Sequence, residues 1–149
     1  MRFITALLIT IVLASGCVAQ QDSRPDLTAD YVEKVIDGDT LEMHSGERIR
    51  LLGIDTPERG EFLYEEASDR LSELVLGKYV RLESDAVERD AYGRLLRYIF
   101  INNTLVNYVL VKEGYAEIYL PQEGTKYEKR LIEAEDYAMQ NRLGIWSGN

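Results

Sequence analysis

The 149-residue chain contains a single cysteine, Cys17, and a single histidine, His44. One cysteine cannot form an intrachain disulfide, and one histidine cannot supply a histidine-rich zinc site or, unaided, a serine–histidine–aspartate triad. Positive charge is also scarce, because 17 Lys and Arg stand against 26 Asp and Glu and give a formal net charge of -9. Bulk charge therefore argues against nonspecific binding to polyanions, and any contact with nucleic acid must come from the local placement of cations.

Apolar residues, by contrast, are plentiful. Hydrophobic residues make up 46% of the chain and charged residues 29%, which is enough apolar material for one packed domain. This composition excludes disordered and collagen-like chains. The excess of acidic residues is concentrated before residue 48, so the rest of the domain is closer to charge balance and could carry a cationic groove.

The first segment of the chain has the features of a secretory signal. Arg2 precedes an apolar run over residues 3–14, which is too short to span a bilayer as a mature helix. Small residues then lead directly to Cys17. The sequence around this cysteine resembles the lipobox of bacterial and archaeal lipoproteins, although Ala14 stands where that pattern usually has leucine.

We therefore expect residues 1–16 to be a signal peptide and residues 17–30 to be a flexible tether, lipidated on Cys17. The acyl chains would anchor the folded domain, residues 31–149, to a membrane outside the cytoplasm. The alternative is a plain cleaved signal with an incidental cysteine, which would make the protein secreted.

Hydrophobic periodicity predicts a three-stranded meander at the start of the domain. Residues 31–36 and 40–44 have strand patterns on either side of an Asp-Gly-Asp turn, and residues 47–54 form a third strand after a Ser-Gly turn. Apolar residues at helical spacings then predict a helix over residues 62–76, with Gly77 as its C-terminal cap.

The second half of the chain also contains both strands and helices. Two strands, 78–83 and 95–101, flank a polar loop, and helices follow over 105–112 and 125–141. The predicted order is βββ-α-ββ-α-α, which belongs to the α+β class. Five short strands with an inserted helix are compatible with a five-stranded OB-fold β-barrel with three helices, and an α+β sandwich is the structural alternative.

Carboxylates occur at two positions of the predicted meander. Asp37 and Asp39 flank a glycine at the first turn, and Asp55 follows the third strand, where it can join Asp39 as a metal ligand. Hard oxygen ligands suit calcium, and the lack of clustered His or Cys argues against a zinc hydrolase. Taken alone, the Asp-Gly-Asp turn has a simpler interpretation, because these residues favour hairpin turns that bind nothing.

Two arginines accompany these carboxylates. Arg50 lies on the apolar third strand, where an unpaired guanidinium would be costly to bury, and Arg94 opens a later strand after a turn. Pro57 fixes the chain so that Glu58 is held near the end of the third strand. Two guanidinium groups beside a carboxylate cluster indicate a phosphate site. Individually, Arg94 could be a solvated charge and Arg50 a structural partner of Glu58.

At these residues the sequence resembles the staphylococcal nuclease (thermonuclease) family. Three segments match its active-site blocks in order and spacing, namely VIDGDTL, IRLLGIDTPE and DAYGRLLRYI, and LGIWS matches the exit of its C-terminal helix. The resemblance covers residues 31–147. It implies an OB-fold, calcium-dependent phosphodiesterase that hydrolyses DNA and RNA and leaves 3′-phosphate ends.

The resemblance also implies a calcium site. Asp39 and Asp55 resemble the calcium-binding carboxylates, and Thr56 resembles the ligand that offers its backbone carbonyl. Asp37 is similar to an acid that lies beside these ligands.

The remaining matched positions concern the substrate. Arg50 and Arg94 resemble the pair that grips the scissile phosphate, and Glu58 resembles the group that activates or orients the attacking water. Tyr92 and Tyr119 are candidates for substrate contact, because an exposed tyrosine can stack on a base.

The chain departs from the family pattern in its charge. The best-known members are basic, whereas this domain is acidic. Ala91 stands where a lysine is familiar, and Glu117 lies where a basic residue would help. We therefore expect weaker and more salt-sensitive binding of long nucleic acid.

Two classes of function follow from the sequence. The first is a membrane-tethered nuclease that acts on DNA or RNA, with no protein partner implied and a monomeric state expected. The second is a non-catalytic OB-fold module that binds nucleic acid or protein, and a remoter alternative is a structural lipoprotein that calcium only stabilises. A binding module need not keep the complete set of acids and arginines, so the sequence favours the nuclease.

Overall fold

The computed structural model describes residues 29–120 and 124–148. The predicted signal peptide and the lipidation residue Cys17 lie outside the described residues and stay predictions. The first strand begins at Ala29, slightly before the predicted start of the domain at Tyr31. Within the described ranges, no helix combines the length and the apolar character needed to cross a membrane.

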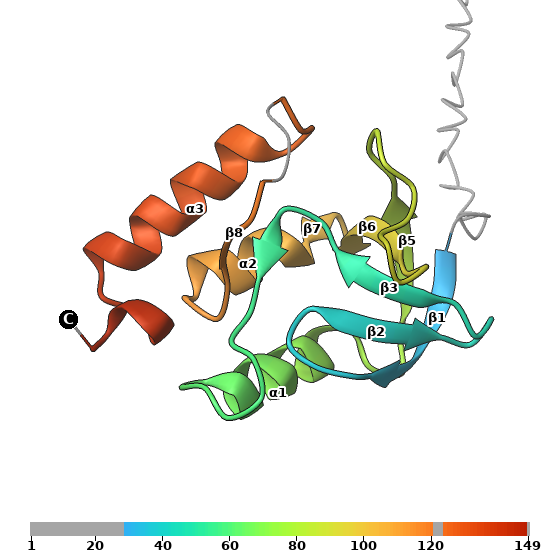
Figure 1. Ribbon diagram of the computed structural model, residues 1–149, viewed down its shortest axis with the longest axis horizontal. Coiled ribbons are helices and arrows are strands. Elements are labelled where there is room, and N and C mark those ends of the chain that lie inside the picture. The colour runs from blue at the N-terminus through green and yellow to red at the C-terminus, as the bar shows by residue number, and fades with distance from the viewer. Residues whose placement is uncertain (1–28, 121–123, 149) are drawn as a thin grey trace, which may run out of the picture.

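Five strands form a closed barrel, as Figure 1 shows. In chain order they are β1 (Ala29–Val35), β2 (Thr40–Met43), β3 (Arg48–Leu51), β5 (Tyr79–Glu83) and β6 (Leu95–Ile101). The first three form the predicted antiparallel meander, β5 pairs with β1 and β6, and a parallel pairing of β3 with β6 closes the ring. On β2, Leu41 and Met43 are fully buried and flank the less buried Glu42, so a register slip of one residue would expose core side chains.

The predicted single strand over residues 47–54 is wrong. The chain leaves the barrel after β3 and continues as the short strand β4 (Ile54–Asp55), which pairs with β8 (Glu117–Ile118) outside the barrel. Gly53 makes this bend with a φ of +76°, a left-handed conformation that costs glycine little. A Cβ atom at this position would lie 2.7 Å from Cδ1 of Leu131, so packing also requires glycine here.

Three α-helices complete the part of the domain that the structure describes. Helix α1 (Tyr64–Val75) buries Ala67, Leu71 and Val75, and it packs beside β1 and α2. Helix α2 (Val106–Lys112) follows the short strand β7 (Thr104–Leu105) and packs between β6 and α3 (Glu128–Gln140), and a 3₁₀ turn η1 (Gly144–Trp146) ends the fold. Figure 1 shows α1 below the barrel and α3 lying along the outer side of α2.

All three helices begin later than predicted, α2 by only one residue. Residue 63 precedes α1 in a left-handed conformation with a φ of 69°, which ends the preceding loop and delays the helix to Tyr64. The backbone N–H of Glu128 donates to the carbonyl of Thr125 in a turn, so α3 begins after that turn. The α+β class and the five-stranded OB-fold barrel with three helices are nevertheless confirmed, and the sandwich alternative is excluded by the closed ring of strands.

Candidate active site

The predicted site residues line one cleft of about 650 Å³ at the end of the barrel where β3 bends away. It is lined by all nine residues named for the site from sequence: Asp37, Asp39, Arg50, Asp55, Thr56, Glu58, Tyr92, Arg94 and Tyr119. They come from the β1–β2 turn, the β3–β4 bend, the loop before α1, the turn before β6 and the segment after β8. The barrel therefore brings together segments that are far apart in the sequence.

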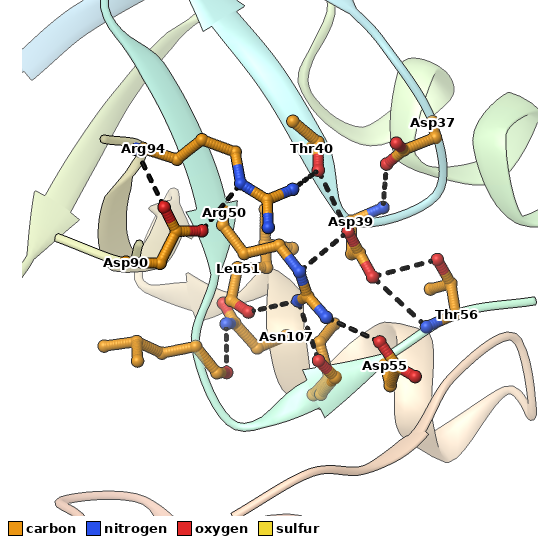
Figure 2. A network of polar contacts seen from close by, with 12 residues as sticks. Asp37, Asp39, Thr40, Arg50, Leu51, Asp55, Thr56, Asp90, Arg94 and Asn107 are labelled. Carbon is orange, nitrogen blue, oxygen red and sulfur yellow. Dashed lines mark hydrogen bonds and ion pairs between the residues drawn. The ribbon is translucent and has the colours of Figure 1, made fainter. Parts of the chain in front are cut away.

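Arg50 is the central cation of the cleft and its side chain is only 13% exposed. Its Nη1 donates to the carbonyls of Leu51 and Ile54 at 2.8 Å each, which ties the guanidinium to both sides of the β3–β4 bend. Its Nη2 donates to Asp55 at 2.6 Å, and its Nε lies 3.1 Å from Asp39 Oδ1 (Figure 2). A planar fork with fixed N–H directions makes these contacts together, which a lysine ammonium cannot do.

Asp39 lies in the turn immediately before β2, with its side chain 9% exposed. Its Oδ2 accepts hydrogen bonds from the backbone N–H and the hydroxyl of Thr56, at 3.2 and 3.1 Å. Asp37 supports the turn, because its Oδ1 accepts the backbone N–H of Asp39 at 3.1 Å. Burial raises the pKa of Asp39 from 3.8 to about 6, with Arg50 opposing the rise and Asp37 adding to it.

The charge balance of the cleft suits a bound cation. Its walls carry five carboxylates, those of Asp37, Asp39, Asp55, Glu58 and Asp90, against the two guanidinium groups of Arg50 and Arg94. A phosphate anion entering this cleft would meet a net negative wall unless a cation were present. No group of three or more His, Cys, Asp and Glu side chains gathers as a metal cluster within the described residues. A cation would therefore rely on two carboxylates, backbone carbonyl oxygen and water, a donor set that calcium accepts.

Arg94 lines the same cleft as Arg50 and lies immediately before β6. Its Nε donates to Asp90 Oδ2 at 2.7 Å, and its Nη1 donates to Thr40 Oγ1 at 3.2 Å (Figure 2). Asp90 Oδ1 also accepts the backbone N–H groups of Tyr92 and Arg94, which forms the turn that delivers the arginine. Burial alone would raise the pKa of Asp90, but these hydrogen bonds lower it below its ordinary value, so Asp90 is a stable anionic partner for Arg94.

The remaining predicted residues lie on the exposed rim of the cleft. Glu58 is exposed, and its backbone N–H donates to Glu61 Oε2 at 2.7 Å within the loop before α1. Tyr92 is 86% exposed and Tyr119 is 57% exposed, so both rings are open to a ligand. The Arg94 guanidinium lies 5.6 Å from the centre of the Tyr92 ring. His44 lies on the surface outside this cleft, with its Nδ1 3.1 Å from Glu33 Oε2.

Three residues that support the cleft were not recognised in the sequence. Thr40 and Asp90 hold Arg94, and each was interpreted only as part of a strand or turn. Asn107 is fully buried in α2, where its side chain accepts the backbone N–H of Ile99 at 3.0 Å and donates to the carbonyl of Leu52 at 2.8 Å. A signal for Asn107 was available, because an asparagine on the apolar face of a helix requires buried partners.

Comparisons with known proteins agree with this fold and site. A family model described as "Staphylococcal nuclease homologue" matches residues 48–148, more than half of the chain. The thermonuclease of Staphylococcus hyicus is 34% identical over 125 residues, which cover 78% of this chain and 74% of that protein. With these relatives, the chain is a nuclease hydrolase. The chain belongs to the staphylococcal nuclease family, as its sequence motifs predicted.

Two Bacillus subtilis endonucleases are also related. The SPbeta prophage-derived endonuclease YokF is 37% identical over 135 residues, which cover 83% of this chain and 45% of YokF. Endonuclease YncB is 36% identical over 127 residues, which cover 78% of this chain and 60% of YncB. The chain therefore spans only part of the length of these two relatives, whereas it spans most of the staphylococcal one.

Proposed function

We propose that the chain is a calcium-dependent nuclease that hydrolyses phosphodiester bonds of DNA and RNA and leaves 3′-phosphate ends. The observation that carries this proposal is the cleft itself, in which two arginines with defined hydrogen bonds face a surplus of carboxylates. Such a cleft can bind an anion and a divalent cation together, and the cation can stabilise the charge that develops during phosphodiester hydrolysis. The family membership of the chain supports the same chemistry.

The two arginines would act on the phosphate. When water attacks phosphorus, negative charge grows on the equatorial oxygens as five bonds surround the atom. Arg50 and Arg94 each have N–H groups in the cleft, and their carboxylate partners hold them in place before the substrate arrives. Preorganised guanidinium groups stabilise the transition state without a cost of reorganisation during the reaction.

Asp39 and Asp55 would hold calcium through their side chains, with the backbone carbonyl of Thr56 as a further ligand. Bound calcium would neutralise phosphate charge and orient the substrate. Asp39 is prepared for this role because burial disfavours its negative charge and Arg50 compensates for that only in part, as the raised pKa indicates. Arg50 holds one oxygen of each carboxylate and so fixes the two ligands relative to each other.

Glu58 would orient the attacking water or accept its proton. Its position on the exposed cleft wall leaves room for a water molecule and for the substrate backbone. Attack on phosphorus then breaks the bond to the 5′ oxygen, so that one product carries a 3′-phosphate and the other a 5′-hydroxyl. Tyr92 and Tyr119 would stack against bases beside the scissile bond. Because stacking needs unpaired bases, the protein would prefer single-stranded substrates.

Analysis of the product ends tests this proposal. The protein is incubated with 5′-labelled DNA and RNA oligonucleotides of the same sequence, and the products are separated before and after phosphatase treatment. We expect both substrates to yield fragments whose mobility changes when the phosphatase removes a 3′-phosphate. Fragments with 3′-hydroxyl ends would overturn the proposed direction of cleavage.

We also propose that the protein is held outside the cytoplasm by lipid on Cys17, since the cysteine follows an apolar run and precedes a polar stretch. Expression of the full chain in a bacterial host tests this proposal. We expect the wild type to incorporate labelled fatty acid and to fractionate with membranes, and Cys17→Ser to lose both properties. Wild-type protein that carries no label and is released in soluble form would favour the secreted alternative.

A further inference from the structure

Thr40 connects the two halves of the cleft although it is not part of the cleft wall. It lies at the start of β2, opposite Arg50 on β3, and is only 3% exposed. Its hydroxyl donates to Asp39 Oδ1 at 3.0 Å and accepts from Arg94 Nη1 at 3.2 Å. Figure 2 shows the hydroxyl between these two side chains.

The direction of this hydrogen-bond chain is fixed by chemistry. A guanidinium has only hydrogen-bond donors and an ionised carboxylate has only acceptors. A hydroxyl that bridges the two must therefore accept from the guanidinium and donate to the carboxylate. The Thr40 hydroxyl has a single proton and must give it to Asp39. Its oxygen is then left to accept from Arg94, so the hydroxyl cannot rotate without breaking one of the two bonds.

Arg94 needs a second point of attachment to be fixed in orientation. Asp90 accepts the Arg94 Nε–H at 2.7 Å. The Arg94 side chain is 28% exposed, so the other end of its guanidinium can rotate unless a second contact holds it. Thr40 binds that other end at Nη1. Two contacts at opposite ends of a planar group define the plane in which its remaining N–H groups point.

We propose that Thr40 is a positioning residue whose hydroxyl sets the orientation of Arg94 relative to Asp39. This inference rests on the proposed function, in which Arg94 binds the scissile phosphate and Asp39 binds calcium. Thr40 thereby aligns the phosphate-binding side of the cleft with its metal-binding side. A threonine is required because valine lacks the hydroxyl, whereas serine keeps it.

Kinetics of full-length variants test the role of Thr40. Thr40→Val keeps the shape and the strand preference of threonine, and we expect it to lower kcat about tenfold, or about 1.4 kcal/mol, with KM changed less than about threefold. Thr40→Ser restores the hydroxyl and is expected to remain within about threefold of the wild type. Thr104→Val, an exposed threonine on β7, is the matched control and is expected to leave kcat unchanged.

A double-mutant cycle shows whether Thr40 acts through Arg94. We expect Thr40→Val to have little effect when Arg94 is already alanine, because the residue that it positions is then absent. Equal effects of Thr40→Val with and without Arg94, or a kcat within twofold of the wild type for Thr40→Val alone, would overturn the proposal.

A spectroscopic measurement separates this proposal from the proposed function. The Arg94 Nε–H signal in a ¹H–¹⁵N NMR spectrum is identified by its disappearance in Arg94→Ala. We expect the same signal position in the wild type and Thr40→Ser, and a shifted or broadened signal in Thr40→Val. An unchanged signal in Thr40→Val would overturn the positioning role. A wild-type protein that cleaves no nucleic acid, but shows the expected NMR change, would overturn the proposed function alone.

Discussion

Replacement of Asn107 by leucine is expected to destabilise the domain by about 3 kcal/mol, because two backbone groups would each lose a partner at about 1–3 kcal/mol. The backbone N–H of Leu52 donates to the carbonyl of Arg97, as the last bond of the parallel β3–β6 pairing. In a regular parallel ladder the N–H of Ile99 would next meet the carbonyl of Leu52. The chain bends away there, and the Asn107 amide bonds both groups instead.

Leucine is the informative replacement because its side chain has the same number of heavy atoms as asparagine and the same branch at Cγ, so it leaves no cavity. The energy lost is then the cost of leaving the Ile99 N–H and the Leu52 carbonyl without partners. Arg50 and Asp55 lie on either side of this bend and line the cleft, so a fall in nuclease activity is expected to accompany the loss of stability.

Urea unfolding monitored by the fluorescence of the only tryptophan, Trp146, measures the effect. With a slope of about 2 kcal/mol per molar, a loss of about 3 kcal/mol moves the midpoint down by about 1.5 M. The control is Gln140→Leu at the exposed end of α3, which is expected to change stability by less than about 0.5 kcal/mol. A loss of stability below about 1 kcal/mol for Asn107→Leu would refute the argument that the Asn107 amide replaces a missing hydrogen bond of the β3–β6 pairing.

Three further predictions address the site and the packing. Arg50→Lys is expected to lower kcat at least about 100-fold in a steady-state assay, because an ammonium cannot make the several fixed contacts of the guanidinium, and near-normal turnover would contradict this role. Since burial raises the pKa of Asp39 to about 6, protons compete with calcium below that pH, and calorimetry should show calcium affinity falling by about tenfold per pH unit below pH 6. The pH dependence of folding stability without metal has the opposite sign, because the contribution of Asp39 to stability is fully present below pH 3.8 and is lost as the pH rises through about 6. Calcium affinity that does not change between pH 8 and pH 5 would contradict Asp39 as a calcium ligand. Gly114→Ala is expected to cost at least about 2 kcal/mol in thermal or urea unfolding, because its φ is +78° and a Cβ would clash with the backbone carbonyl of Leu143. Gly46→Ala, with a φ of +85° and open space around it, should cost less, and equal costs would show that the contact does not matter.

The strands and helices were largely predictable because their patterns are local. Strands β2, β3 and β5 alternate apolar and polar residues, β6 is an almost continuous apolar run, and the helices have apolar residues at helical spacing. The break after β3 was not predictable, since Leu51, Leu52, Gly53 and Ile54 read as one continuous apolar strand. The strand breaks at Gly53, whose φ is +76°, and the packing of this bend against Leu131 on α3 is set by the tertiary structure.

The short strand β8 shows the same limit. Two residues, Glu117 and Ile118, carry no strand pattern of their own, and they pair only because the bend brings β4 beside them. Long-range pairings of this kind are decided by the assembled core rather than by local preference.

The residues named for the site from sequence all line one cleft, because their motifs fall at the turns and strand ends that the barrel gathers together. The residues that support them were missed for a physical reason. Asp90 and Thr40 have ordinary local roles in a turn and a strand, and their bonds to Arg94 depend on side-chain directions that sequence spacing does not give.

Hydrolysis of single-stranded DNA by the purified protein is the measurement that decides whether this cleft is a calcium-dependent phosphodiesterase site. The wild type, Glu58→Ser and the control Glu65→Ser, an exposed residue at the start of α1, are compared with added calcium and with chelator. We predict cleavage that leaves 3′-phosphate ends, is abolished by chelator, is reduced at least about 100-fold in Glu58→Ser and is unchanged in Glu65→Ser. Binding of DNA without cleavage at any calcium concentration would contradict the catalytic role of the cleft.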